Sequence, residues 1–153
     1  MQHLEQYGVE VIMSRTKDEE DPLTEVIKEC NAFAPDLAVD IHNNSDTSGS
    51  GDGAEVFYKH NDATSKAFAQ NVLDEIKAIG QNSRGIKTKL NAQGNDYFGF
   101  IRQTYGHSIL AETAFISNKN DIKIIDTEEE RKAMGKAIAK GIIKTLKEMK
   151  IIE

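Results

Sequence analysis

Residues 37–43, LAVDIHN, are the stretch on which the fold class depends. They are mostly apolar and β-branched, follow Pro35 and lead into a polar loop, a pattern typical of a buried strand in a parallel sheet. His42 stands at the carboxyl end of this predicted strand. Because open α/β sheets hold their binding sites at the carboxyl ends of their strands, His42 becomes the first candidate site residue.

Further along the chain, strands and helices are predicted in turn. Their apolar patterns predict strands at 53–60 and 108–115, a helix at 62–79 and a helix from Thr127 onward. Asp62 is placed to cap the first of these helices, and Thr127 can form a capping box with Glu130 at the start of the second. Both helices therefore carry a start signal as well as an apolar stripe.

Before residue 37, the sequence predicts a helix, a charged loop and a short strand. Apolar residues recur at three- and four-residue spacing in 23–33, and Asp21 with Pro22 is typical of a helix start. Residues 9–13 have alternating character, which predicts a short strand. The residues before Gly8 look like the end of a preceding helix.

This alternation of strands and helices indicates an α/β fold. Such a pattern favours a three-layer αβα arrangement, with a twisted, mostly parallel sheet covered by helices on both faces. A chain of 153 residues has the length of one domain with one core, so we expect a single domain and one active site.

The composition excludes several function classes. The net charge is −6 and basic residues do not collect into a block, so nucleic acid is not an expected partner. No apolar run approaches the roughly 20 residues of a membrane-spanning helix. The single cysteine, Cys30, excludes an intramolecular disulfide and a cysteine-rich metal site.

Two residues stand out as candidates for chemistry. His42 can be read as a metal ligand or as a structural histidine. Glu112 lies inside an apolar strand, where burial would raise the pKa of its carboxyl group and suit it to proton transfer near neutral pH; an ion pair with Arg102 or a nearby lysine is the alternative. A ligand-type histidine and a buried glutamate on two strands are what a metal hydrolase needs.

Three segments resemble the zinc-dependent N-acetylmuramoyl-L-alanine amidase family. Residues 31–44, NAFAPDLAVDIHNN, are similar to its helix asparagine followed by an apolar strand ending in Ser-Ile-His-x-Asn. Residues 106–121, GHSILAETAFISNKND, resemble its Leu-x-Glu strand followed by x-x-Phe-x-Ser-Asn and an acidic residue. Residues 8–15, GVEVIMSR, resemble its Gly-x-x-Val-x-x-Thr-Arg. The segments occur in family order and cover most of the chain.

The resemblance implies roles for individual residues. In that family, two histidines and a glutamate hold zinc, and a second glutamate does the acid and base work. His42 matches the second ligand histidine, Glu112 matches the catalytic glutamate, and Asn44 is expected to help shape the substrate site. The other two ligands are expected upstream of Met1, so the chain is expected to lack the family's first strand and most of its first helix.

Several residues depart from the family pattern or have no role in it. Neither His3 nor Glu5 is expected to replace a missing ligand, because both lie near the carboxyl end of the presumed first helix. Asp40 stands in place of the serine, on the same side of the strand as His42, and could orient that histidine. His60 and His107 are expected to be ordinary surface or core residues.

The loop at 48–53, SGSGDG, lacks the residues of a phosphate-binding or calcium-binding loop. We expect it to be mobile and to border the substrate groove.

The resemblance implies a cell-wall enzyme that cleaves the amide between N-acetylmuramic acid and L-alanine of peptidoglycan with zinc-activated water. Two alternatives remain open: a non-catalytic module of the same fold that binds wall fragments or a protein, and an unrelated α/β domain in which His42 and Glu112 are structural. In the unrelated domain, the two side chains would lie more than about 10 Å apart or on different faces of the sheet. A homodimer through the sheet edge and core surface that the missing first strand and helix would leave exposed is a further expectation.

Overall fold

The sheet at the centre of the molecule has four strands and is mixed, with two of its three pairings parallel. The computed structural model describes all of residues 1–153. In spatial order the strands are β1 (Leu37–Asn44), β4 (His107–Phe115), β2 (Ala54–Tyr58) and β3 (Ser83–Lys87). β1 runs parallel to β4 and β3 runs parallel to β2, while β2 and β4 are antiparallel. The predicted α/β class with a mostly parallel sheet is confirmed.

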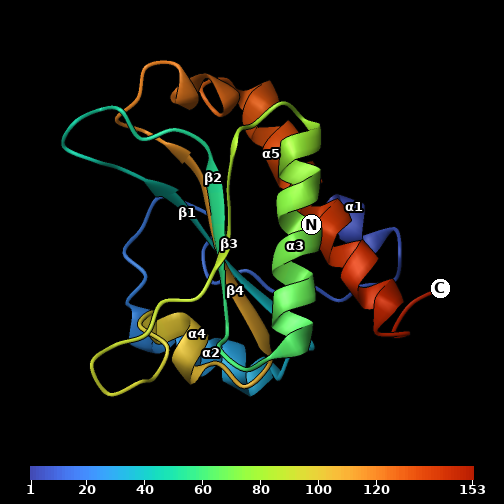
Figure 1. Ribbon diagram of the computed structural model, residues 1–153. Helices are drawn as coiled ribbons and strands as arrows, with labels where there is room; N and C mark the ends of the chain where they lie inside the picture. The colour runs from blue at the N-terminus through green and yellow to red at the C-terminus, as the bar shows by residue number, and fades with distance from the viewer.

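Two long helices cover one face of this sheet (Figure 1). They are α3 (Ala63–Ala78) and α5 (Glu128–Glu148), which pack side by side. The main hydrophobic core lies between them and the sheet, and its fully buried members include Val56, Phe68 and Ile109. The apolar stripes of α3 and α5 explain this placement, because an amphipathic helix buries its apolar side against the sheet and leaves its charged side in water.

Shorter helices cover part of the other face and the flank of α5. α2 (Leu23–Phe33) and α4 (Gly99–Gln103) lie together, and Ile27, Ala38 and Phe100 form a small core between them and β1. The remaining short elements are α1 (Gln2–Glu5), which contacts α5, and η1 (Asp121–Ile124). The helices on both sides complete a three-layer arrangement. None of the helices has the length and apolar character that a bilayer crossing needs.

The start signals read from the sequence are present in both long helices. The Asp62 carboxylate accepts a hydrogen bond from the Ser65 backbone N–H, which caps α3. Thr127 and Glu130 form the reciprocal capping box at the start of α5. These contacts pair N–H groups that have no partner within the helix itself.

Three local predictions need correction. Residues 9–13 are irregular and not a strand, because no strand of the sheet pairs with them. Asp21 does not cap α2: Pro22 occupies the cap position and no side chain bonds there. The edge strand β3 was not predicted at all, since its sequence SRGIK has a glycine and little apolar periodicity.

Candidate active site

The strands direct the candidate residues to the face of the sheet opposite α3 and α5. Leu37 and Val39 pack against the main core, so the alternating side chains of Asp40 and His42 point to the other face. By the same alternation, the core position of Ala111 places Glu112 on that other face. The candidate histidine and glutamate therefore share one side of the sheet.

The strand register then brings three ionisable side chains into one row. His42 on β1 is the direct partner of Glu112 on β4, and Glu112 is the direct partner of Glu55 on β2. Neighbouring strands are separated by about 4.8 Å, well within the 10 Å limit for shared chemistry. The reading in which His42 and Glu112 are unrelated structural residues is thus not supported.

His42 is held by Asp40, two residues before it on β1. Its Nε2 atom lies 2.9 Å from Asp40 Oδ2, and no protein group bonds to Nδ1. The hydrogen bond to Asp40 is the largest influence on the imidazole and raises the pKa of His42, while partial burial opposes the rise. The side chain is about half exposed because β1 is an edge strand. Asp40 therefore orients the ring and leaves one nitrogen available to a ligand.

Glu112 carries a buried oxygen without a hydrogen-bond partner. Its Oε2 atom is inaccessible to solvent and has no donor within reach. Burial is the main cause that raises the pKa of Glu112; Glu55 and Asp40 add to the rise and His42 opposes it. Arg102, the alternative partner, instead donates to the backbone oxygens of Asp96 and Tyr97. Glu112 has no ion-pair partner, so its environment favours a role in proton transfer over a purely structural role.

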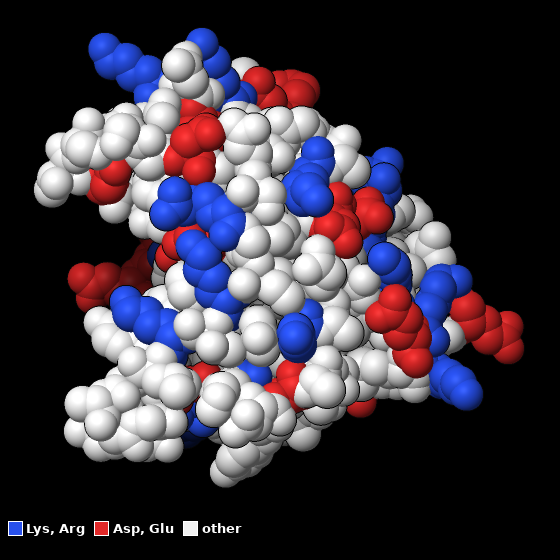
Figure 2. Space-filling model, viewed as in Figure 1, with Lys and Arg blue, Asp and Glu red and all other residues white.

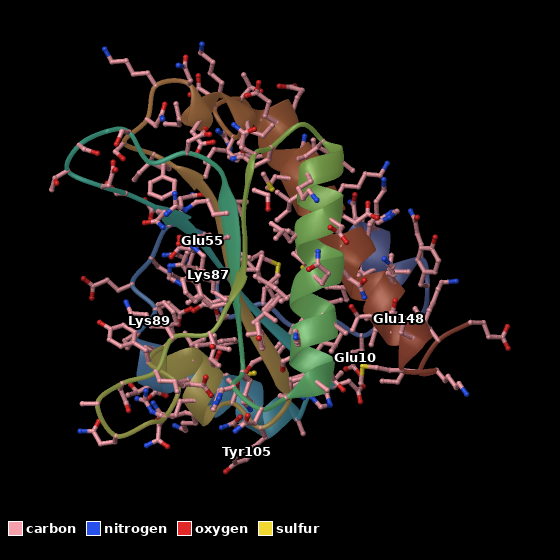
Figure 3. All side chains as sticks on the ribbon, in the orientation of Figure 1. Glu10, Glu55, Lys87, Lys89, Tyr105 and Glu148 are labelled. Carbon is pink, nitrogen blue, oxygen red and sulfur yellow. The ribbon has the colours of Figure 1, made fainter.

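The third member of the row, Glu55, was missed in the sequence. It is only 6% exposed, and Arg84 and Lys87 on β3 both donate to its Oε2 atom. Burial alone would raise its pKa, but the hydrogen bonds and charges of Lys87 and Arg84 outweigh burial and lower the pKa of Glu55. The signal that could have found it is the one that found Glu112, a glutamate inside the apolar strand AEVFY. Figure 3 shows Lys87 next to Glu55.

Asn44 contacts the row through Glu55. Its Nδ2 atom donates to Glu55 Oε1 at 3.1 Å, and its Oδ1 atom accepts from the Ser45 backbone N–H. Since β4 lies between β1 and β2, this amide reaches across the strand that carries Glu112. Asn44 thus shares the candidate site, and its side chain is engaged by protein groups; its role toward substrate stays a prediction.

The glycine-rich loop beside His42 is organised by one aspartate. Asp46 accepts hydrogen bonds from the backbone of Gly49 and Gly51 and from the hydroxyl groups of Ser48 and Ser117. These bonds lower the pKa of Asp46, with the Ser48 hydroxyl as the largest cause. The loop is thereby tied to the segment that follows β4.

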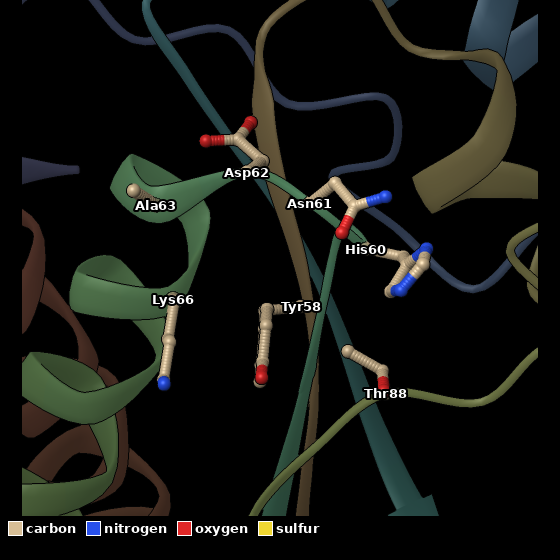
Figure 4. Close-up of a pocket in the computed structure, with 7 residues that line it drawn as sticks. All are labelled: Tyr58, His60, Asn61, Asp62, Ala63, Lys66 and Thr88. Atoms are coloured by element: carbon tan, nitrogen blue, oxygen red, sulfur yellow. The ribbon is translucent and has the colours of Figure 1, made fainter.

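The other histidines lie away from this row. His107 Nδ1 lies 2.8 Å from Asp62 Oδ2 at the start of α3, a hydrogen bond that links β4 to this helix. A hollow of about 490 Å³ lies past the carboxyl end of β2 (Figure 4). The row of ionisable residues crosses β2 near its amino end instead, at Glu55. The residues that line this hollow are Tyr58, His60, Asn61, Asp62, Ala63, Lys66 and Thr88. Neither this hollow nor His3 on α1 extends the candidate site.

A metal would find part of a ligand set at the row. No three His, Cys, Asp or Glu side chains of the chain are grouped around a common point. The His42 imidazole would nevertheless suit zinc as one ligand through Nδ1, and the unpartnered Oε2 of Glu112 would suit the proton of a water activated by that zinc. The residue types present therefore fit a zinc site, but further protein ligands are needed to complete the coordination of the metal.

Comparisons with known sequences point to one family. Residues 1–144 match a family model described as N-acetylmuramoyl-L-alanine amidase. The chain is 29% identical over 139 residues to N-acetylmuramoyl-L-alanine amidase LytC of Bacillus subtilis. The aligned region covers 89% of this chain and 27% of LytC. It spans about a quarter of the length of that relative.

Solved structures agree with this likeness. Cwp6 from Clostridium difficile matches with a TM-score of 0.90 and 38% identity, over 94% of this chain and 23% of that protein. The catalytic domain of CwlV, an N-acetylmuramoyl-L-alanine amidase from Bacillus (Paenibacillus) polymyxa, matches with a TM-score of 0.82 and 28% identity. That second match covers 94% of this chain and 76% of the CwlV domain.

Proposed function

The chain belongs to the N-acetylmuramoyl-L-alanine amidase family, and from this premise we propose that it cleaves the amide between N-acetylmuramic acid and L-alanine in peptidoglycan. The observation that carries the proposal is the unpartnered, buried Oε2 atom of Glu112 beside His42. A buried carboxylate oxygen without a hydrogen-bond partner costs roughly 1–3 kcal/mol, so a structural role alone does not account for it. The site of action would be the bacterial cell wall.

In this proposal Glu112 moves protons. Its Oε2 atom accepts a proton from the attacking water and then donates it to the nitrogen of the leaving L-alanine. The raised pKa of Glu112 suits both steps, because a carboxyl group with a pKa closer to neutral holds the proton long enough to return it.

His42 would bind the metal, and Asp40 would orient His42. His42 would bind zinc through Nδ1, while Asp40 accepts from Nε2 and keeps the ring in one orientation. When bound, zinc would lower the pKa of the water and polarise the scissile carbonyl group. A catalytic zinc needs about three protein ligands, so we also propose that the remaining ligands come from a segment outside these 153 residues.

The test is a paired assay on purified peptidoglycan with added zinc. We expect new amino groups of L-alanine to appear, and Glu112→Gln to reduce their rate of release about 100-fold or more while zinc content by mass spectrometry stays unchanged. His42→Ala should lower both zinc content and rate. Because one imidazole holds zinc weakly, the chain alone is expected to need excess zinc, and a longer chain that supplies the other ligands to need less.

A matched control and two opposing outcomes complete the assay. Lys136→Gln changes one charge on the exposed side of α5 and should leave the rate unchanged. Sedimentation with peptidoglycan without any release of amino groups, even from the longer chain, would favour the non-catalytic binding module. Release that is equal in the parent and in Glu112→Gln would contradict the role of Glu112.

A further inference from the structure

The edge strand β3 places two cations at the end of the glutamate row. Arg84 Nε lies 2.9 Å from Glu55 Oε2, and Lys87 Nζ bonds to the same oxygen. Both side chains remain partly open, with 40% of Arg84 and 37% of Lys87 exposed. The Arg84 guanidinium carbon also lies 5.0 Å from the centre of the Phe115 ring, within the range of a cation–π contact. These cations are therefore held in place while part of each faces solvent.

Most hydrogen-bond donors of this pair have no protein partner. A guanidinium carries about five N–H donors and an ammonium about three, and Glu55 takes one from each. The two cations and one carboxylate leave one positive charge at this end of the row. Figure 2 shows blue side chains gathered around a red one on the side of the molecule where β2 and β3 lie in Figure 1.

The opposite end of the row offers no comparable set of free donors. There Asp40 pairs with His42 on β1, whereas the cationic donors that can attract an anionic group lie at β3. Lys89 extends the positive edge beyond β3, where its Nζ atom lies 3.9 Å from the centre of the Tyr97 ring. Figure 3 shows Lys89 farther along from Lys87, on the same side of the molecule. The donors available to an anionic group therefore lie on the β3 side of the row.

We propose that Arg84 and Lys87 bind the free carboxylate of an acidic residue that follows the alanine in the stem peptide. This inference rests on the proposed function. The carboxylate would lie two residues, or about 7 Å, beyond the cut amide. β3 lies two strand spacings, about 10 Å, from Glu112, and the long cationic side chains cover the difference. The site would prefer a free carboxylate to an amide at that position, because a guanidinium fork matches a carboxylate.

The experiment compares two synthetic muramoyl tripeptides that differ in one group. Both contain L-alanine, γ-linked D-glutamate and an amidated L-lysine, and the α-carboxyl group of the glutamate is free in one and amidated in the other. Their Kd values are measured by NMR titration of this chain without added metal, so that no cleavage consumes the ligand. We expect the free acid to bind about tenfold more tightly or better.

Variants assign the preference to the pair. Arg84→Gln and Lys87→Gln should each reduce the acid-to-amide ratio several-fold, while Lys136→Gln on the far side of the molecule should keep the parent ratio. Far-UV circular dichroism checks that each variant is folded. The second variant keeps the test decisive if the first disturbs Glu55.

Each other outcome overturns a defined claim. Equal Kd values for the two tripeptides in the parent would refute the carboxylate site and leave the amidase proposal intact. A preference that persists in both variants would refute the assignment to Arg84 and Lys87. Failure of both tripeptides to bind the parent would refute the carboxylate site, because Arg84 and Lys87 are both present without metal, and the peptidoglycan assay with zinc would still decide the amidase proposal.

Discussion

At the scale of single residues, two glutamates on adjacent strands have opposite environments. Glu55 is paired with two cations, which lower the pKa of its carboxyl group. Glu112 is its direct register partner, has an unpartnered oxygen, and burial raises its pKa. Two carboxyl groups whose pKa values are pushed apart can take different roles at one pH. The structure supports Glu112 as the proton carrier and Glu55 as the fixed charge.

This contrast predicts opposite pH dependences for two conservative variants. Because the folded-state pKa of Glu112 is raised, the native chain binds more protons than the unfolded chain between the two pKa values, and its free energy of unfolding falls as pH rises through that window. Glu112→Gln removes this loss. The free energy of unfolding of the variant minus that of the parent should therefore be larger at about pH 8 than at about pH 4. We expect this increase to be up to about 1 kcal/mol.

Glu55→Gln is the matched control with the opposite sign. The lowered pKa of Glu55 contributes stability above its unfolded pKa, and this contribution is lost as pH falls through the folded pKa. Its variant should therefore be more destabilised at about pH 8 than at about pH 4. Urea denaturation of the metal-free chain at both pH values measures these differences. The same pH dependence in both variants would contradict the assigned environments.

At the scale of elements, the packing of α3 against α5 depends on a close approach of their backbones. A Cβ atom added at Gly141 on α5 would lie 2.5 Å from the Cα atom of Val72 on α3, closer than two carbon atoms can approach. Val72 is completely buried in the main core. The glycine thus allows the two helices to lie in contact behind the sheet that carries the site.

A pair of glycine substitutions on α5 should have opposite effects. Gly141→Ala forces the helices apart and should lower the free energy of unfolding by about 1–3 kcal/mol. Gly135→Ala meets no atom within 4 Å, so the higher helix propensity of alanine should raise stability by about 0.5–1 kcal/mol. Thermal or urea denaturation measures both. Equal effects of the two substitutions would argue against the close approach at Gly141.

At the scale of the whole molecule, β1 forms one open edge of the sheet. The Ile41 side chain of β1 is 56% exposed, although it lies on the sheet face that is buried in the neighbouring strands. His42 lies on the opposite face of β1. An exposed strand with an apolar side chain can pair with another chain. The expected homodimer through this edge remains a prediction.

Light scattering over a range of concentrations tests that dimer. We expect the mass of two chains at high concentration, and Ile41→Lys should shift the mass toward one chain because a charge on an edge strand opposes pairing. The exposed Lys136→Gln again serves as the control. A single-chain mass at all concentrations would rule out the dimer.

Local patterns determined much of this protein in advance. The strands that carry His42 and Glu112, the two long helices and their capping residues follow from periodicity and short-range hydrogen bonds, which depend only on neighbouring residues. The resemblance of residues 31–44 and 106–121 to one amidase family was borne out by the family match. These features could be read because the physical causes are local.

The tertiary structure alone decided what surrounds the two candidate residues. The alternating residues 9–13 are not a strand, since alternation becomes a strand only when another strand supplies hydrogen bonds. β3, with little apolar signal, joins the sheet by pairing with β2 and brings Arg84 and Lys87 to Glu55. The row from His42 to Glu55 depends on the register between β1, β4 and β2, a long-range property that no single segment contains.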